Sequence, residues 1–122
     1  MPAITTLPDI SAPIGVPYGL FDVLGGAYSA TLSGDLTLTT DYPAVVKLDP
    51  GGAGRTITLE AESGAAGRFR LVVNSADAAE VLTINDDGGS EVSSPTQSEA
   101  ALLYCDGTSW TEIAVFTISF TP

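Results

Sequence analysis

Carboxylates are the side chains of this sequence best suited to chemistry, because its 122 residues include 15 aspartates and glutamates but no histidine. Histidine is the usual general base, and serine and cysteine nucleophiles commonly depend on it. Two carboxylates can still work as an acid/base pair, as in glycosidases. The candidates are Asp86, Asp87 and Glu91, in a stretch rich in glycine and serine. Solvated turn residues of this kind are far more common than catalytic pairs, and we predict that the protein is not an enzyme.

Two glycine-rich stretches were considered as ligand sites. Residues 51–56 superficially resemble a phosphate-binding loop, but they lack the lysine and spacing of the Walker motif, and no predicted helix follows. We therefore interpret them as a hairpin turn. Residues 86–91 offer oxygen ligands for calcium, but their spacing does not match an EF-hand. We predict no catalytic residue, no metal site and no cofactor.

Arg55, Arg68 and Arg70 are three of only four basic residues in the chain. Arg68 and Arg70 alternate with Phe69 and Leu71, so a strand would place both arginines on one face and the apolar side chains on the other. Arginine pairs well with carboxylates in a bidentate geometry. We expect either inter-subunit ion pairs with a neighbouring copy or modest ion pairs within one subunit. The sequence leaves both alternatives open.

The net charge of −11 limits the partners of the protein. Such a charge repels the phosphates of nucleic acids and of anionic membranes, so we expect neither as a partner. The mean hydropathy of +0.28 is high, yet no run approaches the roughly 20 apolar residues that span a bilayer. The extra apolar content belongs either to the core or to a surface buried against other chains. The single cysteine, Cys105, lies in an apolar run and is expected to be buried.

Residues 1–28 are predicted to form an extended N-terminal arm. Prolines at positions 2, 8, 13 and 17 exclude a helix and a central strand, and they favour an extended path. Seven apolar residues between and after these prolines are candidate contacts with another protein or subunit: Leu7, Ile10, Ile14, Val16, Tyr18, Leu20 and Phe21. The alternative is a peripheral strand that packs on its own domain.

Residues 29–122 are predicted to form an all-β domain, an antiparallel β-sandwich or jelly roll of about seven or eight short strands. Short runs of alternating or β-branched residues, separated by turn residues, support this fold. The runs span residues 36–39, 45–48, 56–60, 68–73, 81–85, 100–105 and 113–116, with 118–120 as a last short edge. Asp106 and Gly107 lie between two of them and predict a hairpin turn.

The elements between residues 48 and 116 follow one another in a distinctive order. An alternating strand at 55–60 comes first, followed by Ala66-Gly67-Arg68-Phe69 and the strand 71–74. Next come the strand 82–84 and an acidic glycine turn. The order ends with the run 101–110, which closes with Asp-Gly-Thr-Ser-Trp110. This order resembles the β-rich domains of tailed-bacteriophage virion proteins, which include capsid decoration (cement) proteins, head fibres and fibre tips. The resemblance covers somewhat over half of the chain.

The resemblance implies a capsid decoration protein. Such a protein is a homotrimer of β-sandwich subunits on the outer surface of the virion, where it binds the major capsid protein and stabilises the assembled shell. It would be synthesised in the host cytoplasm, and the arm would grip the capsid or link subunits. A chain that starts at its own Met1 favours this over part of a long fibre. A partner that binds only the assembled shell shifts the equilibrium toward it.

The alternative function is a receptor- or carbohydrate-binding module of the fibre-tip type. Such a module needs an exposed aromatic platform or a bound calcium ion. The sequence offers Trp110 for the platform and Asp86 and Asp87 for the ion.

Overall fold

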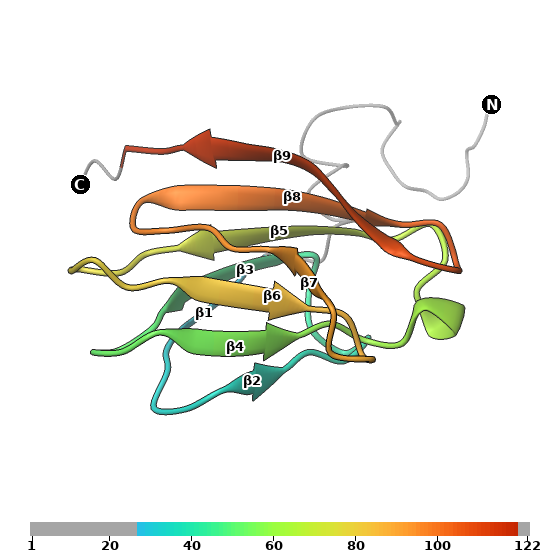
Figure 1. The fold of residues 1–122 in the computed structure, drawn as a ribbon, viewed down its shortest axis with the longest axis horizontal. Helices are drawn as coiled ribbons and strands as arrows, with labels where there is room; N and C mark the ends of the chain where they lie inside the picture. Colours follow the sequence, from blue (N-terminus) through green and yellow to red (C-terminus); the bar gives the residue numbers. More distant parts are fainter. Residues whose placement is uncertain (1–26, 120–122) are drawn as a thin grey trace, which may run out of the picture.

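The computed structural model describes residues 27–119, and these residues form strands with a single helical turn (Figure 1). The strands are β1 (Ala27–Thr31), β2 (Leu36–Thr37), β3 (Val45–Asp49), β4 (Arg55–Thr58), β5 (Phe69–Asn74), β6 (Leu82–Asn85), β7 (Glu91–Ser93), β8 (Glu99–Cys105) and β9 (Trp110–Thr117). The 3-10 turn η2 spans Glu62–Gly64. The all-β prediction is confirmed for this range. No helix within it is long and apolar enough to cross a membrane.

The strands form two sheets, and the chain passes back and forth between them. One sheet has five strands in the order β1-β3-β5-β8-β9, and the other has four in the order β2-β4-β6-β7. From β1 to β6 each strand lies in the sheet opposite to the one before it. Along the chain, two strands that are neighbours in one sheet are therefore separated by one strand of the other sheet. This winding makes the pairs β1–β3, β2–β4, β3–β5 and β4–β6 parallel.

The predicted antiparallel pairing is present only in β5–β8, β6–β7 and β8–β9. A strand–turn–strand pattern looks alike whether the turn is a hairpin or a crossing to the other sheet, and residues 51–54 show the difference. A hairpin was expected there, but this segment joins β3 to β4, which lie in different sheets. Gly51 has a φ of +80°, and a Cβ there would lie 2.1 Å from the backbone oxygen of Leu32. Only glycine fits this crossing.

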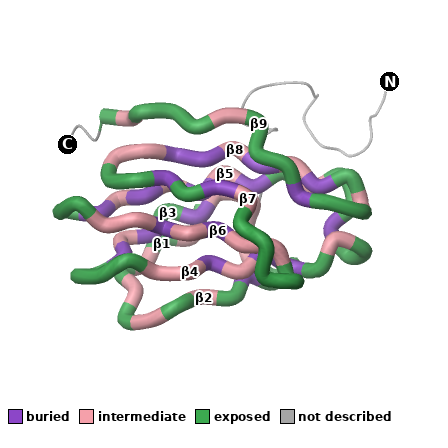
Figure 2. Tube along the Cα trace, viewed as in Figure 1, coloured by how far each residue is buried: buried purple, intermediate pink, exposed green. Residues whose placement is uncertain are grey.

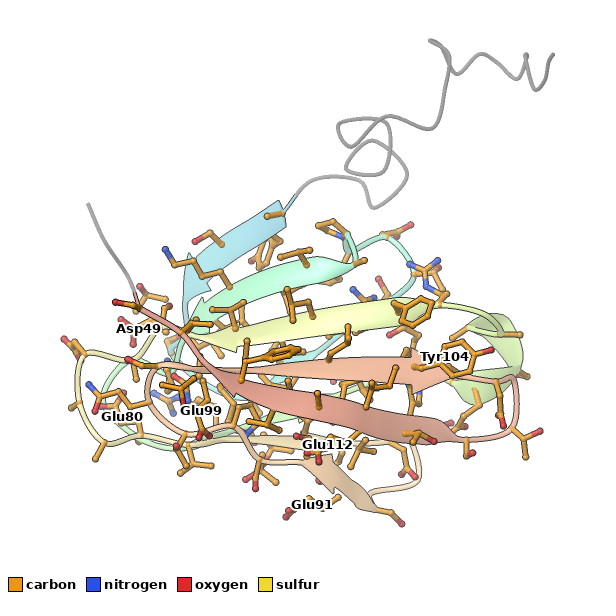
Figure 3. The ribbon with its side chains drawn as sticks, turned by 90° about the horizontal axis from the view of Figure 1, so that it is seen from above. Asp49, Glu80, Glu91, Glu99, Tyr104 and Glu112 are labelled. Carbon is orange, nitrogen blue, oxygen red and sulfur yellow. The ribbon has the colours of Figure 1, made fainter. Side chains whose placement is uncertain are left out.

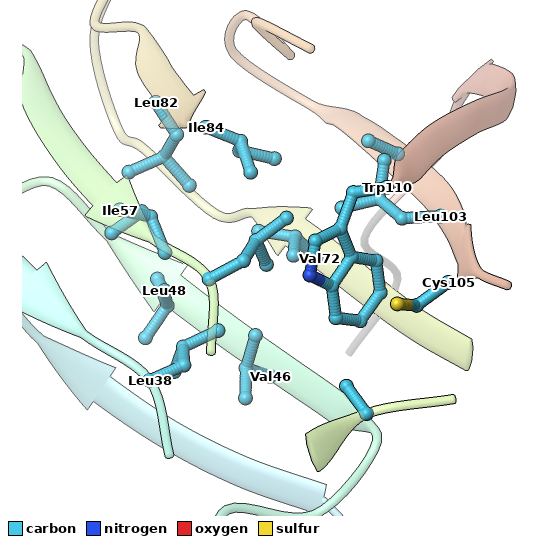
Figure 4. Close-up of a cluster of buried hydrophobic side chains, with 13 residues drawn as sticks. Leu38, Val46, Leu48, Ile57, Val72, Leu82, Ile84, Leu103, Cys105 and Trp110 are labelled. Carbon is cyan, nitrogen blue, oxygen red and sulfur yellow. The ribbon is translucent and has the colours of Figure 1, made fainter. Parts of the chain in front are cut away.

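The apolar core lies between the two sheets. The four-stranded side contributes Ile57, Leu82 and Ile84, and residues that follow its strands add Leu38 and Leu59. The five-stranded side contributes Val46, Leu48, Val72, Ala101, Leu103, Cys105 and Trp110 (Figure 4). Cys105 is buried, as expected. Because strands of both sheets supply this cluster, the hydrophobic effect holds the layers together.

A fully buried arginine lies among these apolar residues. Arg70, on β5, has no exposed surface. Its Nε and Nη2 donate to the two carboxylate oxygens of Glu60 at 3.1 and 2.8 Å. Nη2 also donates to the backbone oxygen of Thr39 at 2.8 Å, and Nη1 donates to that of Pro43. A buried guanidinium is tolerated only when its donors are satisfied in this way.

Glu60 extends this polar centre to the far edge of the five-stranded sheet. Its backbone oxygen accepts a hydrogen bond from Nε1 of Trp110 at 3.0 Å. Nε of Arg68 lies 3.3 Å from the same carboxylate that binds Arg70. The centre therefore joins β5, the segment after β2, the segment after β4, and β9.

We predict that Arg70→Met lowers the free energy of unfolding by about 3–5 kcal/mol, because it leaves the Glu60 carboxylate buried without its main partner. Urea denaturation followed by Trp110 fluorescence measures the loss. Arg55→Met is the matched control, since the Arg55 guanidinium is part-exposed and its Nε donates to the backbone oxygen of Pro50 at 2.8 Å. Removing that bond costs about 1 kcal/mol. A loss for Arg70→Met no larger than that of the control contradicts the central role of this arginine.

Candidate functional site

The side of the five-stranded sheet that faces away from the core is mainly apolar, and we call it the outer face. It is formed by Ala27, Ser29, Thr31, Val45, Lys47, Asp49, Phe69, Leu71, Val73, Ala100, Leu102, Tyr104, Thr111, Ala114 and Phe116. Over β5, β8 and β9 this face carries no charged side chain. Phe69 and Phe116 are exposed over 46% and 44% of their surface. Contiguous exposed apolar surface of this kind marks sites of protein contact.

Register places the apolar side chains of the outer face in rows across the strands. Val45 lies beside Leu71, Leu71 beside Leu102, and Leu102 beside Ala114. Phe69 and Tyr104 are also paired, with ring centroids 5.0 Å apart. Figure 3 looks onto this sheet, with Tyr104 near one end of β8 and the labelled carboxylates toward the other end and the β9 margin. The outer face is thus a continuous patch.

The other sheet provides an internal comparison. Its strands bury Ile57, Leu82 and Ile84, and they turn Thr56, Thr58, Thr83 and Asn85 outward. Polar outward residues are typical of a sheet face in contact with water. The two sheets of one molecule therefore differ: the four-stranded sheet is suited to solvent, whereas the outer face is suited to a covering partner.

β9 is one of the two edge strands of the five-stranded sheet, and β1 is the other. None of the described strands pairs with the far side of β9. Ile113 and Val115 are exposed over 52% and 40% of their surface, and most of β9 is green in Figure 2. Its one charged residue, Glu112, accepts a hydrogen bond from Ser93 of β7 at 2.6 Å, which directs the carboxylate toward the other sheet. An open edge of this length with a single charged side chain can pair with another chain.

Ile113 is placed by an irregularity in the β8–β9 ladder. Leu102 pairs with Ala114, whereas Leu103 pairs with Glu112, so Ile113 has no opposite residue. A β-bulge of this type bends the strand and redirects the side chain of the extra residue. The bulge accounts for the exposure of a large β-branched residue on a strand.

One carboxylate cluster has the composition of a cation site. One carboxylate oxygen from each of Asp49, Asp77 and Glu80 lies within 4.8 Å of the other two. Oxygen ligands of this type suit calcium. Acidic groups also gather at surfaces without an ion, so this geometry alone assigns no metal to the protein. Asp49 ends β3, whereas Asp77 and Glu80 lie in the segment between β5 and β6. Nothing in the local sequence pattern indicates that these two segments meet.

A second carboxyl pair joins η2 to the turn after β6. A hydrogen bond from its own backbone N–H favours the ionised form of Glu62, but the hydrogen bond to Asp87 and the charges of Asp87 and Asp86 raise its pKa above the ordinary value. Asp87 was a candidate for an acid/base pair, and Glu62 was not. Asp86 instead accepts hydrogen bonds from the backbone N–H of Gly88 and Ser90. These bonds identify it as a turn residue.

The three arginines singled out in the sequence have different environments in the structure. Arg70 is sealed inside the subunit, so its ion pair with Glu60 is intramolecular and it has no surface to offer a neighbouring copy. Arg68 is partly exposed, lies beside the same carboxylate, and donates from Nη2 to the backbone oxygen of Thr40 at 3.4 Å. Inter-subunit ion pairs of Arg55 and Arg68 stay a prediction. The arm contacts predicted at Leu7, Ile10, Ile14, Val16, Tyr18, Leu20 and Phe21 lie outside the described residues.

Trp110 was the aromatic candidate for a carbohydrate platform. It is only 6% exposed, and its Nε1 is bonded to the backbone of Glu60. A sugar cannot stack on a ring in that position. Within residues 27–119, an aromatic pair that does reach the surface is Phe69, which is exposed, with the half-buried Tyr104 on the outer face.

Comparisons with family models, curated proteins and solved structures give no match to this chain.

The turn that positions β9 depends on Asp106. The predicted hairpin is present: β8 and β9 are antiparallel, and Gly107 has a φ of +98°. One carboxylate oxygen of Asp106 accepts hydrogen bonds from the backbone N–H of Thr108 and Ser109 at 2.8 and 2.9 Å. The bonds from Ser109 and Thr108 lower the pKa of Asp106 below its ordinary value. The ionised form thus stabilises the start of the edge strand.

We predict that this contribution is lost in acid. Because the folded-state pKa is depressed, the stabilisation is present above the unfolded-state value and disappears as the pH falls through the folded-state value. Thermal midpoints at about pH 5 and about pH 2 should differ less for Asp106→Asn than for the wild type, since the amide keeps an acceptor but does not titrate. Asp41→Asn, in another exposed turn, is the control. An equal drop in the wild type and Asp106→Asn contradicts this account.

Proposed function

We propose that this chain is a structural protein that binds other protein subunits through the β9 side of its five-stranded sheet. The observation that carries the proposal is the open, eight-residue β9 with its exposed Ile113 and Val115. Backbone groups at such an edge give affinity to an incoming chain, and the exposed side chains give selectivity.

The other sheet edges support this choice by contrast. β2 has two residues and β7 has three, and the β6–β7 pairing is irregular. Short and irregular edges discourage pairing with another chain. β1 has five residues and is the strand that residues 1–26 lead into. Among the described strands, β9 is the longest of the four edge strands, and the tightly bonded Asp106 turn fixes its first residue.

The specific form that we propose is a decoration protein of a tailed-phage capsid. It would bind the major capsid protein on the outside of the assembled shell as a homotrimer of β-sandwich subunits, and it would stabilise that shell. The support is the resemblance of residues 48–116 to such proteins together with the edge described above. A net charge of −11 would also keep coated particles apart in solution.

Purified virions of the phage that encodes the chain test this form of the proposal. The chain should be recovered from them in a fixed ratio to the major capsid protein. Purified protein should also co-sediment with assembled empty shells, fail to bind unassembled capsid subunits, and raise the temperature at which the shells come apart. Absence from virions, or equal binding to unassembled subunits, overturns the decoration function.

Substitutions on β9 test the binding edge itself. We predict that Ile113→Lys combined with Val115→Lys weakens shell binding by at least about tenfold, because charges on an edge strand oppose pairing. Ala78→Lys combined with Ala79→Lys adds the same charge in an exposed turn and should bind like the wild type. Co-sedimentation at a series of protein concentrations gives the affinities. If the two double variants bind equally well, β9 is not the contact.

A further inference from the structure

Residues 27–119 leave the outer face uncovered, although it is apolar over β5, β8 and β9. We propose that residues 4–24 of the same copy cover it. The inference concerns how this chain completes its own fold, so it goes beyond the proposed function and can fail independently of it.

The apolar pattern of β5 is the first reason to expect a cover. Strands that are apolar on both faces are typical of sheets covered on both sides. β5 has this character: Val72 is buried in the core, while Leu71 and Val73 lie only half-buried on the outer face. The polar outward residues of the four-stranded sheet show that this chain does use a solvated face where one is needed.

The position and length of the N-terminal segment form the second argument. Residues 1–26 lead directly into Ala27, which is the first residue of β1. β1 is an edge strand of this same sheet. Five strands are about 19 Å across. Ten extended residues reach about 33 Å, so even part of the segment can cross the outer face from β1 to β9.

The composition of the segment is the third argument. It is rich in apolar residues, contains no basic residue, and has only Asp9 and Asp22 as acids. It can therefore cover a face that carries no charge over β5, β8 and β9 without burying many charges of its own. Its three prolines, Pro8, Pro13 and Pro17, cannot donate to a sheet ladder, which suits a path across a face better than pairing at an edge. They also reduce the entropy lost when the segment becomes ordered.

Tethering favours the same copy over a neighbour. A segment attached beside its binding face has an effective concentration in the millimolar range for a short flexible connection. A second copy at ordinary protein concentrations must compete with this and must also overcome repulsion between two chains of charge −11. The occupant is thus residues 4–24 of the copy that owns the face.

Limited proteolysis of the full chain tests the inference. Chymotrypsin cleaves after aromatic residues, and the segment contains Tyr18 and Phe21. A synthetic peptide of residues 1–26 gives the rate for the undocked segment. Cleavage at these two positions in the protein should be at least about tenfold slower than in the peptide. It should also be unchanged on dilution to a concentration at which light scattering shows a monomer.

A matched pair of variants assigns any protection to the outer face. Leu71→Thr with Leu102→Thr makes the centre of the face polar, whereas Leu71→Val with Leu102→Val has nearly the same shape but stays apolar. Both retain strand-forming residues, and Trp110 fluorescence and the thermal midpoint confirm that each is folded. The threonine variant should lose most of the protection, and the valine variant should keep it.

Three results would overturn the inference. Cleavage of the wild-type protein at the rate of the peptide means that the segment does not dock. Equal protection in the threonine and valine variants means that it docks elsewhere. Protection that vanishes on dilution to the monomer means that a neighbouring copy, and not the same one, occupies the face. None of these results depends on shell binding, so the two proposals fail separately.

Discussion

The buried ion pair between Arg70 and Glu60 is the interaction on which the arrangement of this molecule depends. A guanidinium taken out of water is tolerated only with its donors bonded, and here the partners of Arg70 on β5 come from the segment after β2 and the segment after β4. Trp110 joins the same centre through the backbone of Glu60, so the edge strand is held as well. Apolar burial draws the two sheets together, and the hydrogen bonds of this polar centre fix which segments of the two sheets lie in contact.

The same arginine decides which side of β5 faces the core. Alternation in the sequence correctly predicted that Arg70 and Phe69 lie on opposite faces. It did not indicate that the charged face is the inner one, because the carboxylate that makes burial tolerable is ten residues away in another sheet-forming segment. Once Arg70 is inside, Phe69, Leu71 and Val73 must face outward. The candidate surface is therefore a consequence of an interior ion pair that local pattern could not reveal.

Strand positions were largely predictable from the sequence, and strand partners were not. Runs with alternating or β-branched residues gave β3, β4, β5, β6 and β8 within a few residues. β1 and β7 were missed, because Ala27–Thr31 is rich in small residues and Glu91–Ser93 is short. Pairing depends on whether each turn reverses within a sheet or crosses between sheets, and that depends on contacts such as Gly51 against Leu32. The hairpin turn at Asp106-Gly107 was predictable because the hydrogen bonds that form it join residues within the turn.

An open edge with a single charged side chain and a strongly acidic chain are compatible for a physical reason. A long exposed edge strand invites copies of the same chain to pair, which natural proteins oppose with charges or bulges. Here β9 has one bulge and one carboxylate directed toward the other sheet, so the edge itself gives little protection. Repulsion between copies of net charge −11 supplies this protection against self-pairing at longer range. A partner surface without that negative charge meets no such barrier. The same edge can therefore disfavour pairing with another copy of this chain and still bind a different protein.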